Sequence, residues 1–271
     1  MVHVFNGKKF AQKKEEELRI KVSRLHLKGV AVKLAVIIVG NNEASKIYVN
    51  LKEKAAERIG IVFQLIELQM ATKEMLLHLI EGLNEDTSVN GIMVQLPLID
   101  ELVQNKDEIL KSINSEKDVD GLREDSRFLP ATAKAILHSV KAAQNMGYLD
   151  KHWDDIVACV VGASGMVGRP VVRDLKQKGV KVLECDVNTR NLAKATIQAD
   201  LLVSATGVPN LIKGDMVKKG AVVIDVGAPK GDVNLEEVSR VASFITPVPG
   251  GIGPVTVVSL LENTVLAVSK G

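Results

Sequence analysis

Aliphatic runs of strand length recur along the chain, and segments with helical periodicity separate them. In the first half the runs are LAVIIVG (34–40), VFQLIELQ (62–69) and NGIMVQLPL (90–98). Continuous apolar runs of this length are typical of strands buried on both faces. Amphipathic segments at 45–59 and up to about 84 predict helices between them. This β-α-β alternation predicts a parallel sheet, whose ligands bind beyond the carboxyl ends of the strands.

Four further runs predict a second parallel sheet in the other half of the chain. They are IVACVVGASGMVGRP (156–170), VKVLECD (180–186), ADLLVSATG (199–207) and AVVIDVG (221–227). The stretch KDVDGLREDSRFLPATAKA (117–135), which combines charge with Gly and Pro, interrupts the alternation. We interpret it as the crossing between two domains.

The predicted fold class is therefore α/β with two domains. The first domain covers residues 1–121 and opens with an amphipathic helix at about 9–28. A C-terminal helix, 254–271, joins this domain by packing back on it. A connecting helix region covers 122–146, and a second, doubly wound domain covers 147–253.

The composition is that of a globular protein with an aliphatic core. Charged residues make up 25% of the 271 residues, aromatic residues only 3%, and the net charge is +2. The scattered basic residues argue against a nucleic-acid partner. No segment has the length of a signal peptide or membrane span, so we expect no membrane partner and a cytoplasmic location. Cys159 and Cys185 are expected to be buried thiols, with no disulfide and no metal site.

The first strand of the second domain is followed by glycines at GxxGxxG spacing, Gly162, Gly165 and Gly168. Glycines at such a turn let backbone N–H groups approach a pyrophosphate, which the N-terminus of the next helix also favours. Asp186 ends the following strand, where an acidic residue accepts hydrogen bonds from an adenosine ribose. The alternatives are a simple strand-to-helix turn and a solvated carboxylate; together the two features favour a Rossmann-like dinucleotide site.

In the first domain, Tyr48 and Lys52 are spaced i, i+4 and share a helix face. On spacing alone, a solvated lysine is the more common role. The YxxxK pair of short-chain dehydrogenases is disfavoured, because there the glycine-rich turn precedes the pair. Gln95 follows the third strand and could face the same crevice. Asp118 and Asp120 lie in the crossing loop, where stabilising a turn is the alternative role.

Six blocks stand out along the chain: ASKIYVNLKEKAAERIGI (44–61), GIMVQLPL (91–98), KDVDG (117–121), VVGASGMVGRPV (160–171), GAVVIDVG (220–227) and TPVPGGIGPVTVVSLLENT (246–264). These blocks resemble the successive signatures of the methylenetetrahydrofolate dehydrogenase/cyclohydrolase family. The blocks occur in the family's order from about residue 34 to 264. This resemblance implies a folate cleft between the two domains and a homodimer. It also implies oxidation of 5,10-methylenetetrahydrofolate by NADP or NAD, and hydrolysis of the methenyl product to 10-formyltetrahydrofolate.

The resemblance assigns roles to individual residues. Lys52 is implied to be the catalytic lysine, with Tyr48 beside it over the pterin. Gln95 is its implied hydrogen-bond partner, and Asp120 the implied anchor of the pterin ring nitrogens. The remaining substrate-binding residues are implied to be Leu96, Pro97, Pro249, Gly250, Gly251 and Pro254. The expected dinucleotide-binding set is Gly162, Ala163, Ser164, Gly165, Val167, Gly168, Asp186, Asn188, Thr189, Arg190, Ala205, Thr206, Gly207, Val226, Gly227, Gly251, Ile252 and Thr256.

The sequence departs from the family pattern at positions that bear on the cofactor. The family usually has Arg-Ser where Ala163-Ser164 stand, and Ser followed by a basic residue where Val187-Asn188 stand. Family membership favours NADP and the local chemistry favours NAD, so both stay open. The segment after Gly121 is shorter than usual, which leaves a dehydrogenase without cyclohydrolase activity as an alternative. A non-catalytic protein that binds dinucleotide or folate is a third, disfavoured hypothesis.

Overall fold

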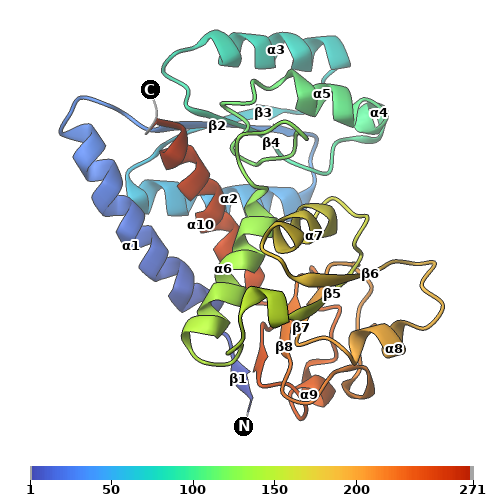
Figure 1. Cartoon of the computed structure of the whole chain (residues 1–271). Helices are drawn as coiled ribbons and strands as arrows, with labels where there is room; N and C mark the ends of the chain where they lie inside the picture. Colours follow the sequence, from blue (N-terminus) through green and yellow to red (C-terminus); the bar gives the residue numbers. More distant parts are fainter. Residues whose placement is uncertain (1, 269–271) are drawn as a thin grey trace. The chain divides into compact units, whose positions relative to one another are not determined.

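The computed structural model describes residues 2–268, which form two compact units (Figure 1). The three-stranded unit holds residues 12–131 and 257–268. The six-stranded unit holds residues 2–11 and 132–256. No helix within residues 2–268 combines the length and apolarity that a membrane span requires.

The boundaries of the units differ from the predicted domain bounds at three places. Residues 2–11 belong to the six-stranded unit, because β1 (His3–Val4) pairs in parallel with β9 (Phe244–Ile245). The predicted connecting region is divided between the units, since the boundary lies between Ala131 and Thr132 at the start of α6 (Ala131–Asn145). The C-terminal helix α10 (Ile252–Val268) contributes its residues from Val257 onward to the three-stranded unit.

The three-stranded sheet is parallel, in the order β3-β2-β4, and confirms the three predicted strands of the first half. They are β2 (Lys33–Val39), β3 (Val62–Leu68) and β4 (Gly91–Val94). The last strand is shorter than its apolar run. The N–H of Gln95 still donates to the carbonyl of Ile37 at 2.8 Å, but Pro97 has no N–H with which to continue the ladder.

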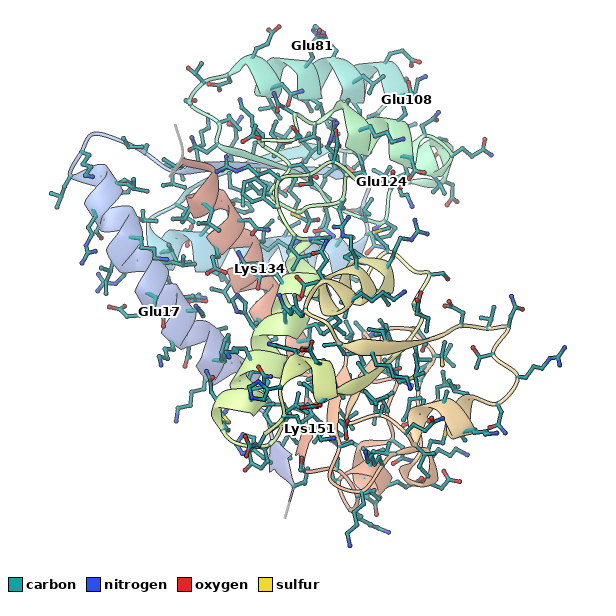
Figure 2. All side chains as sticks on the ribbon, viewed as in Figure 1. Glu17, Glu81, Glu108, Glu124, Lys134 and Lys151 are labelled. Atoms are coloured by element: carbon teal, nitrogen blue, oxygen red, sulfur yellow. The ribbon has the colours of Figure 1, made fainter. Side chains whose placement is uncertain are left out.

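Helices cover both faces of this sheet (Figure 1). On one face lies α2 (Glu43–Ile59), which Asn42 caps at its start; on the other lie α3 (Lys73–Glu85) and α5 (Lys106–Ser112), preceded by the short α4 (Asp100–Val103). The Nζ of Lys73 on α3 lies 3.3 Å from Oε1 of Glu108 on α5, and Figure 2 labels Glu108. The core on this face comprises Ala35, Ile37, Val39, Leu76, Ile80, Leu83, Ile109 and Leu110, among others.

The six-stranded sheet is parallel throughout, in the order β1-β9-β8-β7-β5-β6. It contains the four predicted strands, β5 (Val157–Val161), β6 (Lys181–Cys185), β7 (Leu201–Ser204) and β8 (Val222–Asp225). The chain places β6 on one side of β5 and β7 on the other, so the strand order reverses between β5 and β7. Ligands of doubly wound sheets bind at such a switch point, beyond the carboxyl ends of the strands. The shorter helical segments of this unit are α7 (Gly168–Gln177), α8 (Leu192–Thr196), α9 (Leu235–Val238), η1 (Trp153–Asp155) and η2 (Gly214–Met216).

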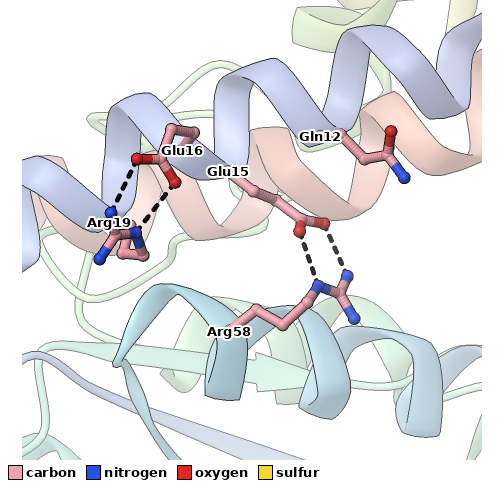
Figure 3. A pocket seen from close by; sticks show the side chains of 5 residues that line it. All are labelled: Gln12, Glu15, Glu16, Arg19 and Arg58. Carbon is pink, nitrogen blue, oxygen red and sulfur yellow. Dashed lines mark hydrogen bonds and ion pairs between the residues drawn. The ribbon is translucent and has the colours of Figure 1, made fainter.

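The first helix, α1 (Gly7–His26), contacts α2 through a paired ionic interaction (Figure 3). Both carboxylate oxygens of Glu15 accept hydrogen bonds at 2.7 Å from the guanidinium of Arg58. A surface hollow of about 620 Å³ lies here, lined also by Gln12, Glu16 and Arg19. Glu16 and Arg19 pair with each other at 2.8 Å. All four charges are therefore neutralised within the hollow, and we base no function on it.

Candidate active site

Lys52 is a buried lysine in the middle of α2. Its side chain is only 7% exposed, although lysines are rarely withdrawn from water without a partner. The Nζ donates a hydrogen bond of 2.8 Å to Oε1 of Gln95 and lies 3.4 Å from Sδ of Met93. Both partners come from β4 and the residue after it. The sheet therefore brings together Lys52 and Gln95, as the resemblance implied.

Burial shifts the ionisation of Lys52 and of Asp120 toward their uncharged forms. Loss of hydration lowers the pKa of Lys52, and the negative charge of Asp120 partly opposes this shift. Loss of hydration likewise raises the pKa of Asp120, with Lys52 opposing the shift and Asp118 adding to it. Within residues 2–268, no hydrogen bond reaches the carboxylate of Asp120. A carboxyl group beside the lysine is thus free to receive hydrogen bonds from a ligand.

The loop that carries Asp120 is fixed from three directions. Asp118 is buried, and its carboxylate accepts the N–H groups of Gly121, Leu122 and Arg123 at 3.2, 3.4 and 3.0 Å. Lys117 donates to three carbonyl groups at the end of α3, those of Leu83, Asn84 and Asp86, at 2.7–3.0 Å. Asn263 of α10 donates to the carbonyls of Val119 and Leu129, at 2.8 and 3.1 Å. The position of Asp120 is therefore set by hydrogen bonds from α3, the loop itself and α10.

Sequence reasoning missed Asn263 and left the role of Asp118 open. Asp118 stabilises the turn, the alternative weighed for the two loop aspartates. Asn263 is the single amide side chain in the mostly apolar helix α10, and a buried polar side chain requires a hydrogen-bond partner. This is the signal that could have marked it.

The other expected folate-binding residues are divided between the units. Tyr48 lies one helical turn before Lys52 and is 41% exposed. Leu96 is half-buried and Pro97 is exposed, directly after Gln95. Pro249, Gly250, Gly251 and Pro254 belong to the six-stranded unit. A cleft formed by both units stays a prediction.

In the six-stranded unit, the turn after β5 contains two glycines at which neighbouring backbone atoms leave no room for a side chain. Gly162 has φ +83°, and a Cβ there would lie 2.4 Å from the carbonyl oxygen of Ala205. A Cβ on Gly168 would lie 2.1 Å from the carbonyl oxygen of Gly162. Both contacts are with backbone atoms, so these positions require glycine.

The same turn presents N–H groups at the start of α7. Gly162 and Ala163 donate to the carbonyl of Cys185, and Gly165 donates to that of Gly162. In the described part of the chain, the N–H groups of the next three residues, Met166, Val167 and Gly168, have no partner. Unpaired N–H groups at a helix N-terminus form an anion site, so the turn fits the pyrophosphate of a dinucleotide.

The turn after β6 lies against the glycine turn. The carboxylate of Asp186 accepts the N–H of Ser164, at 3.1 Å to Oδ2 and 3.3 Å to Oδ1. Thr189 closes the turn, because its hydroxyl accepts the N–H of Asp186 at 2.9 Å and its N–H donates to the carbonyl of Asp186 at 2.8 Å. Asn188 and Arg190 are exposed beside it. The carboxylate of Asp186 is thus held against the glycine turn by a hydrogen bond and is not freely solvated.

The remaining expected dinucleotide residues follow β7, β8 and β9 at the same carboxyl edge of the sheet. Ala205, Thr206 and Gly207 follow β7, Val226 and Gly227 follow β8, and Gly251, Ile252 and Thr256 lie beyond β9. Asp232, which sequence reasoning missed, holds the turn after β7. Its Oδ2 accepts hydrogen bonds from Ser204 Oγ, Thr206 N and Thr206 Oγ1 at 2.7–2.9 Å.

The segment after β9 is compact as well. Gly250 has φ +99°, and a Cβ on Gly251 would lie 2.5 Å from the carbonyl oxygen of Pro247. The carbonyls of Gly250 and Gly251 face Gly7 at the start of α1, where a Cβ would lie 2.7 and 1.8 Å from their oxygens. The absence of a side chain at Gly7 therefore lets this segment pass close to the start of α1 within the six-stranded unit.

Together these features define an α/β enzyme that binds a dinucleotide at a doubly wound parallel sheet and has a buried lysine in a second parallel-sheet unit. Two family models match the chain. "Tetrahydrofolate dehydrogenase/cyclohydrolase, catalytic domain" matches residues 5–120, and the NAD(P)-binding domain of the same family matches residues 130–271. The chain therefore belongs to the tetrahydrofolate dehydrogenase/cyclohydrolase family, as the resemblance predicted.

Individual relatives agree with this assignment. The bifunctional protein FolD of Exiguobacterium sibiricum is 45% identical over 283 residues, which cover 98% of this chain and 99% of that protein. The crystal structure of the bifunctional FolD dehydrogenase/cyclohydrolase of Campylobacter jejuni has a TM-score of 0.92 at 42% identity and covers 98% of both chains. The Trypanosoma brucei FolD structure, complexed with NADP and an inhibitor, has a TM-score of 0.88 at 32% identity and covers 98% and 97%.

Proposed function

We propose that this protein oxidises 5,10-methylenetetrahydrofolate to 5,10-methenyltetrahydrofolate with NADP or NAD. It then hydrolyses the methenyl product to 10-formyltetrahydrofolate. Family membership supports both activities, and one observation in the structure carries the assignment of the site. That observation is the buried hydrogen bond of 2.8 Å between Lys52 Nζ and Gln95 Oε1, beside the carboxyl group of Asp120.

Lys52 is proposed to act in the hydrolysis. Methenyltetrahydrofolate is a cationic amidinium, and a water molecule must bond to its one-carbon centre while losing a proton. A neutral amine can take that proton, and burial lowers the pKa of Lys52 toward the range where a neutral amine is present. The bond from the one-carbon unit to N5 then breaks as the added hydroxyl group loses its proton and becomes the formyl carbonyl. N5 takes up a proton in the same step, and the formyl group stays on N10.

The neighbours of Lys52 are proposed to orient it and the substrate. Gln95 fixes the direction of the amine through its amide oxygen. The carboxyl group of Asp120 can pair with N–H groups of the aminopyrimidine ring, and Tyr48 can pack over the pterin from one turn before Lys52. Leu96 and Pro97 follow Gln95 beyond the carboxyl end of β4. Pro249, Gly250, Gly251 and Pro254 are proposed to line the substrate from the six-stranded unit.

The glycine turn is proposed to hold the dinucleotide. A bound nicotinamide ring accepts the hydride that the methylene group loses in the oxidation. The chain contributes the N–H groups of residues 166–168 and the dipole of α7 to the pyrophosphate, and the Asp186 carboxylate to the ribose hydroxyls. The rest of the dinucleotide is proposed to be lined, along the carboxyl edge of the sheet, by Ala205, Gly207, Val226 and Ile252.

Two assays on one preparation test the proposal. Purified protein is given 5,10-methylenetetrahydrofolate with NAD or NADP, and the reduced nicotinamide is followed by absorbance. The decay of methenyltetrahydrofolate is measured separately against the uncatalysed rate. Reduction of at least one dinucleotide together with accelerated decay is the expected result. Reduction without accelerated decay would leave a dehydrogenase only, and no reduction of either dinucleotide would contradict the proposal.

The protein is further proposed to act as a cytoplasmic homodimer. The family resemblance implies the dimer. The thiols of Cys159 and Cys185 are free, and their Sγ atoms share a hydrogen bond of 3.6 Å rather than a disulfide, which fits a reducing compartment. Size-exclusion chromatography with light scattering should give the mass of two chains. A single-chain mass at micromolar concentration would contradict the dimer.

A further inference from the structure

We infer that the dinucleotide turn of this chain selects NAD over NADP, and that Asp186 is the residue that discriminates between them. The inference rests on the proposed function only in taking the glycine turn as the dinucleotide site. NAD and NADP differ only in the 2′-phosphate on the adenosine ribose. Selection must therefore come from groups near the end of β6, where that ribose lies in doubly wound folds.

Asp186 places a fixed negative charge at this position. It is the first residue after β6, and its carboxylate is held 3.1 Å from the N–H of Ser164 in the glycine turn. Thr189 fixes the backbone of Asp186 with two hydrogen bonds, of 2.8 and 2.9 Å. The carboxylate thus has little freedom to turn away from a ligand. Its remaining lone pairs can accept hydrogen bonds from ribose hydroxyls.

Two basic side chains near Asp186 are already engaged within the protein, and the positions beside it carry apolar residues. Ala163 is buried at 3% exposure and carries no polar side chain, and Val187 is fully exposed and apolar. The guanidinium of Arg169 already donates to the carbonyl of Ser164 at 3.0 Å. Lys176 of α7 is paired with Glu184 of β6. Arg190 is exposed and lies four residues beyond Asp186.

A 2′-phosphate brings close to two negative charges to the site at neutral pH. Repulsion between these charges and a carboxylate a few ångströms away, in a partly hydrated setting, weakens binding about tenfold or more. The 2′-hydroxyl of NAD gains a charge-assisted hydrogen bond to the same carboxylate. Both effects favour NAD. The repulsion weakens as salt screens the charges, whereas a steric barrier would not respond to salt.

Isothermal titration calorimetry with NAD and with NADP, alongside kcat/KM for both, tests the inference on the whole chain. We expect the wild type to prefer NAD at least about tenfold. Asp186→Asn should improve the affinity for NADP about tenfold and leave or slightly weaken that for NAD. Asp186→Ser is the second variant if the amide disturbs the turn, and thermal melts verify the fold of each. Asp215→Asn, which removes an exposed charge on η2 of the same unit, should leave the preference unchanged.

The ratio of the affinities for NAD and NADP should also fall in the wild type as ionic strength is raised to about 1 M. The same ratio in Asp186→Asn should not change. Tighter binding of NADP than of NAD by the wild type would overturn the inference, as would an unchanged preference in both Asp186 variants. Calorimetry separates this result from the proposed function. Selective binding of NAD without folate-dependent reduction would uphold the inference and contradict the dehydrogenase activity.

Discussion

Replacing Gly168 with alanine tests whether the glycine turn owes its shape to close backbone packing. A Cβ at this position would lie 2.1 Å from the carbonyl oxygen of Gly162 and 2.8 Å from its carbonyl carbon. Close contacts between carbon and a carbonyl oxygen are normally about 3.3 Å or longer, so the two segments must separate by roughly 1 Å. Overpacking of this kind costs about 1–3 kcal/mol of unfolding free energy. A displacement of about 1 Å where reactants are oriented can lower a rate about 100-fold.

We therefore expect Gly168→Ala to lower kcat/KM for the dinucleotide about 100-fold and to leave hydrolysis of methenyltetrahydrofolate near the wild-type rate. Hydrolysis is spared because Lys52 lies in the other unit. Both activities and a thermal melt are measured on the same preparation. Gly82→Ala is the matched control, since a Cβ in that part of α3 meets no atom within 4 Å. It should stabilise the protein by about 0.5–1 kcal/mol. Wild-type dinucleotide kinetics in Gly168→Ala would refute the packing argument.

Two further predictions concern the three-stranded unit. Asp118→Ala should lower the free energy of unfolding by about 3 kcal/mol, because three N–H groups lose a charged acceptor. It should also raise KM for the folate, because the loop that carries Asp120 is released. Urea denaturation measures the first effect and folate kinetics the second, and an unchanged KM would remove Asp118 from substrate positioning. The second concerns pH: because burial lowers the pKa of Lys52 in the folded chain, the unfolded chain keeps that proton over a wider pH range. The unfolding free energy should therefore rise with pH from the lowered pKa up to about 10.4, the ordinary lysine value. Denaturation at a series of pH values should show that Lys52→Met lacks this part of the rise, and an identical slope in both proteins would mean that Lys52 titrates normally.

The strands of both sheets could be predicted because each is an uninterrupted aliphatic run. The pairing of β1 with β9 could not, since each strand has only two residues and no periodic pattern. Its consequence, the transfer of residues 2–11 to the six-stranded unit, was therefore hidden as well. Short helices such as α8 and α9 could not be predicted either, because segments of five and four residues are too short to show a helical period.

Residue spacing alone favoured a solvated role for Lys52, because its partners are distant in sequence. Met93 and Gln95 are 41 and 43 positions away, and only the parallel pairing of β2 with β4 brings them under α2. Family resemblance supplied what spacing could not. Asn263 escaped both approaches, since the two carbonyls that it binds lie 144 and 134 positions away. The place of Asp186 at the end of β6, in contrast, could be predicted directly, because an uninterrupted aliphatic run marks the strand. Its role toward a dinucleotide stays a prediction.

The most direct test of the proposed role of Lys52 is the hydrolysis rate of Lys52→Met beside Lys54→Met. Lys54 lies two residues further along α2 and is exposed, so both variants lose a lysine side chain from the same helix. General base catalysis contributes about 100- to 10,000-fold, and we predict that Lys52→Met loses hydrolysis to that extent while remaining folded. Lys54→Met should hydrolyse methenyltetrahydrofolate like the wild type. Equal hydrolysis by both variants would contradict the assignment of Lys52 as the base.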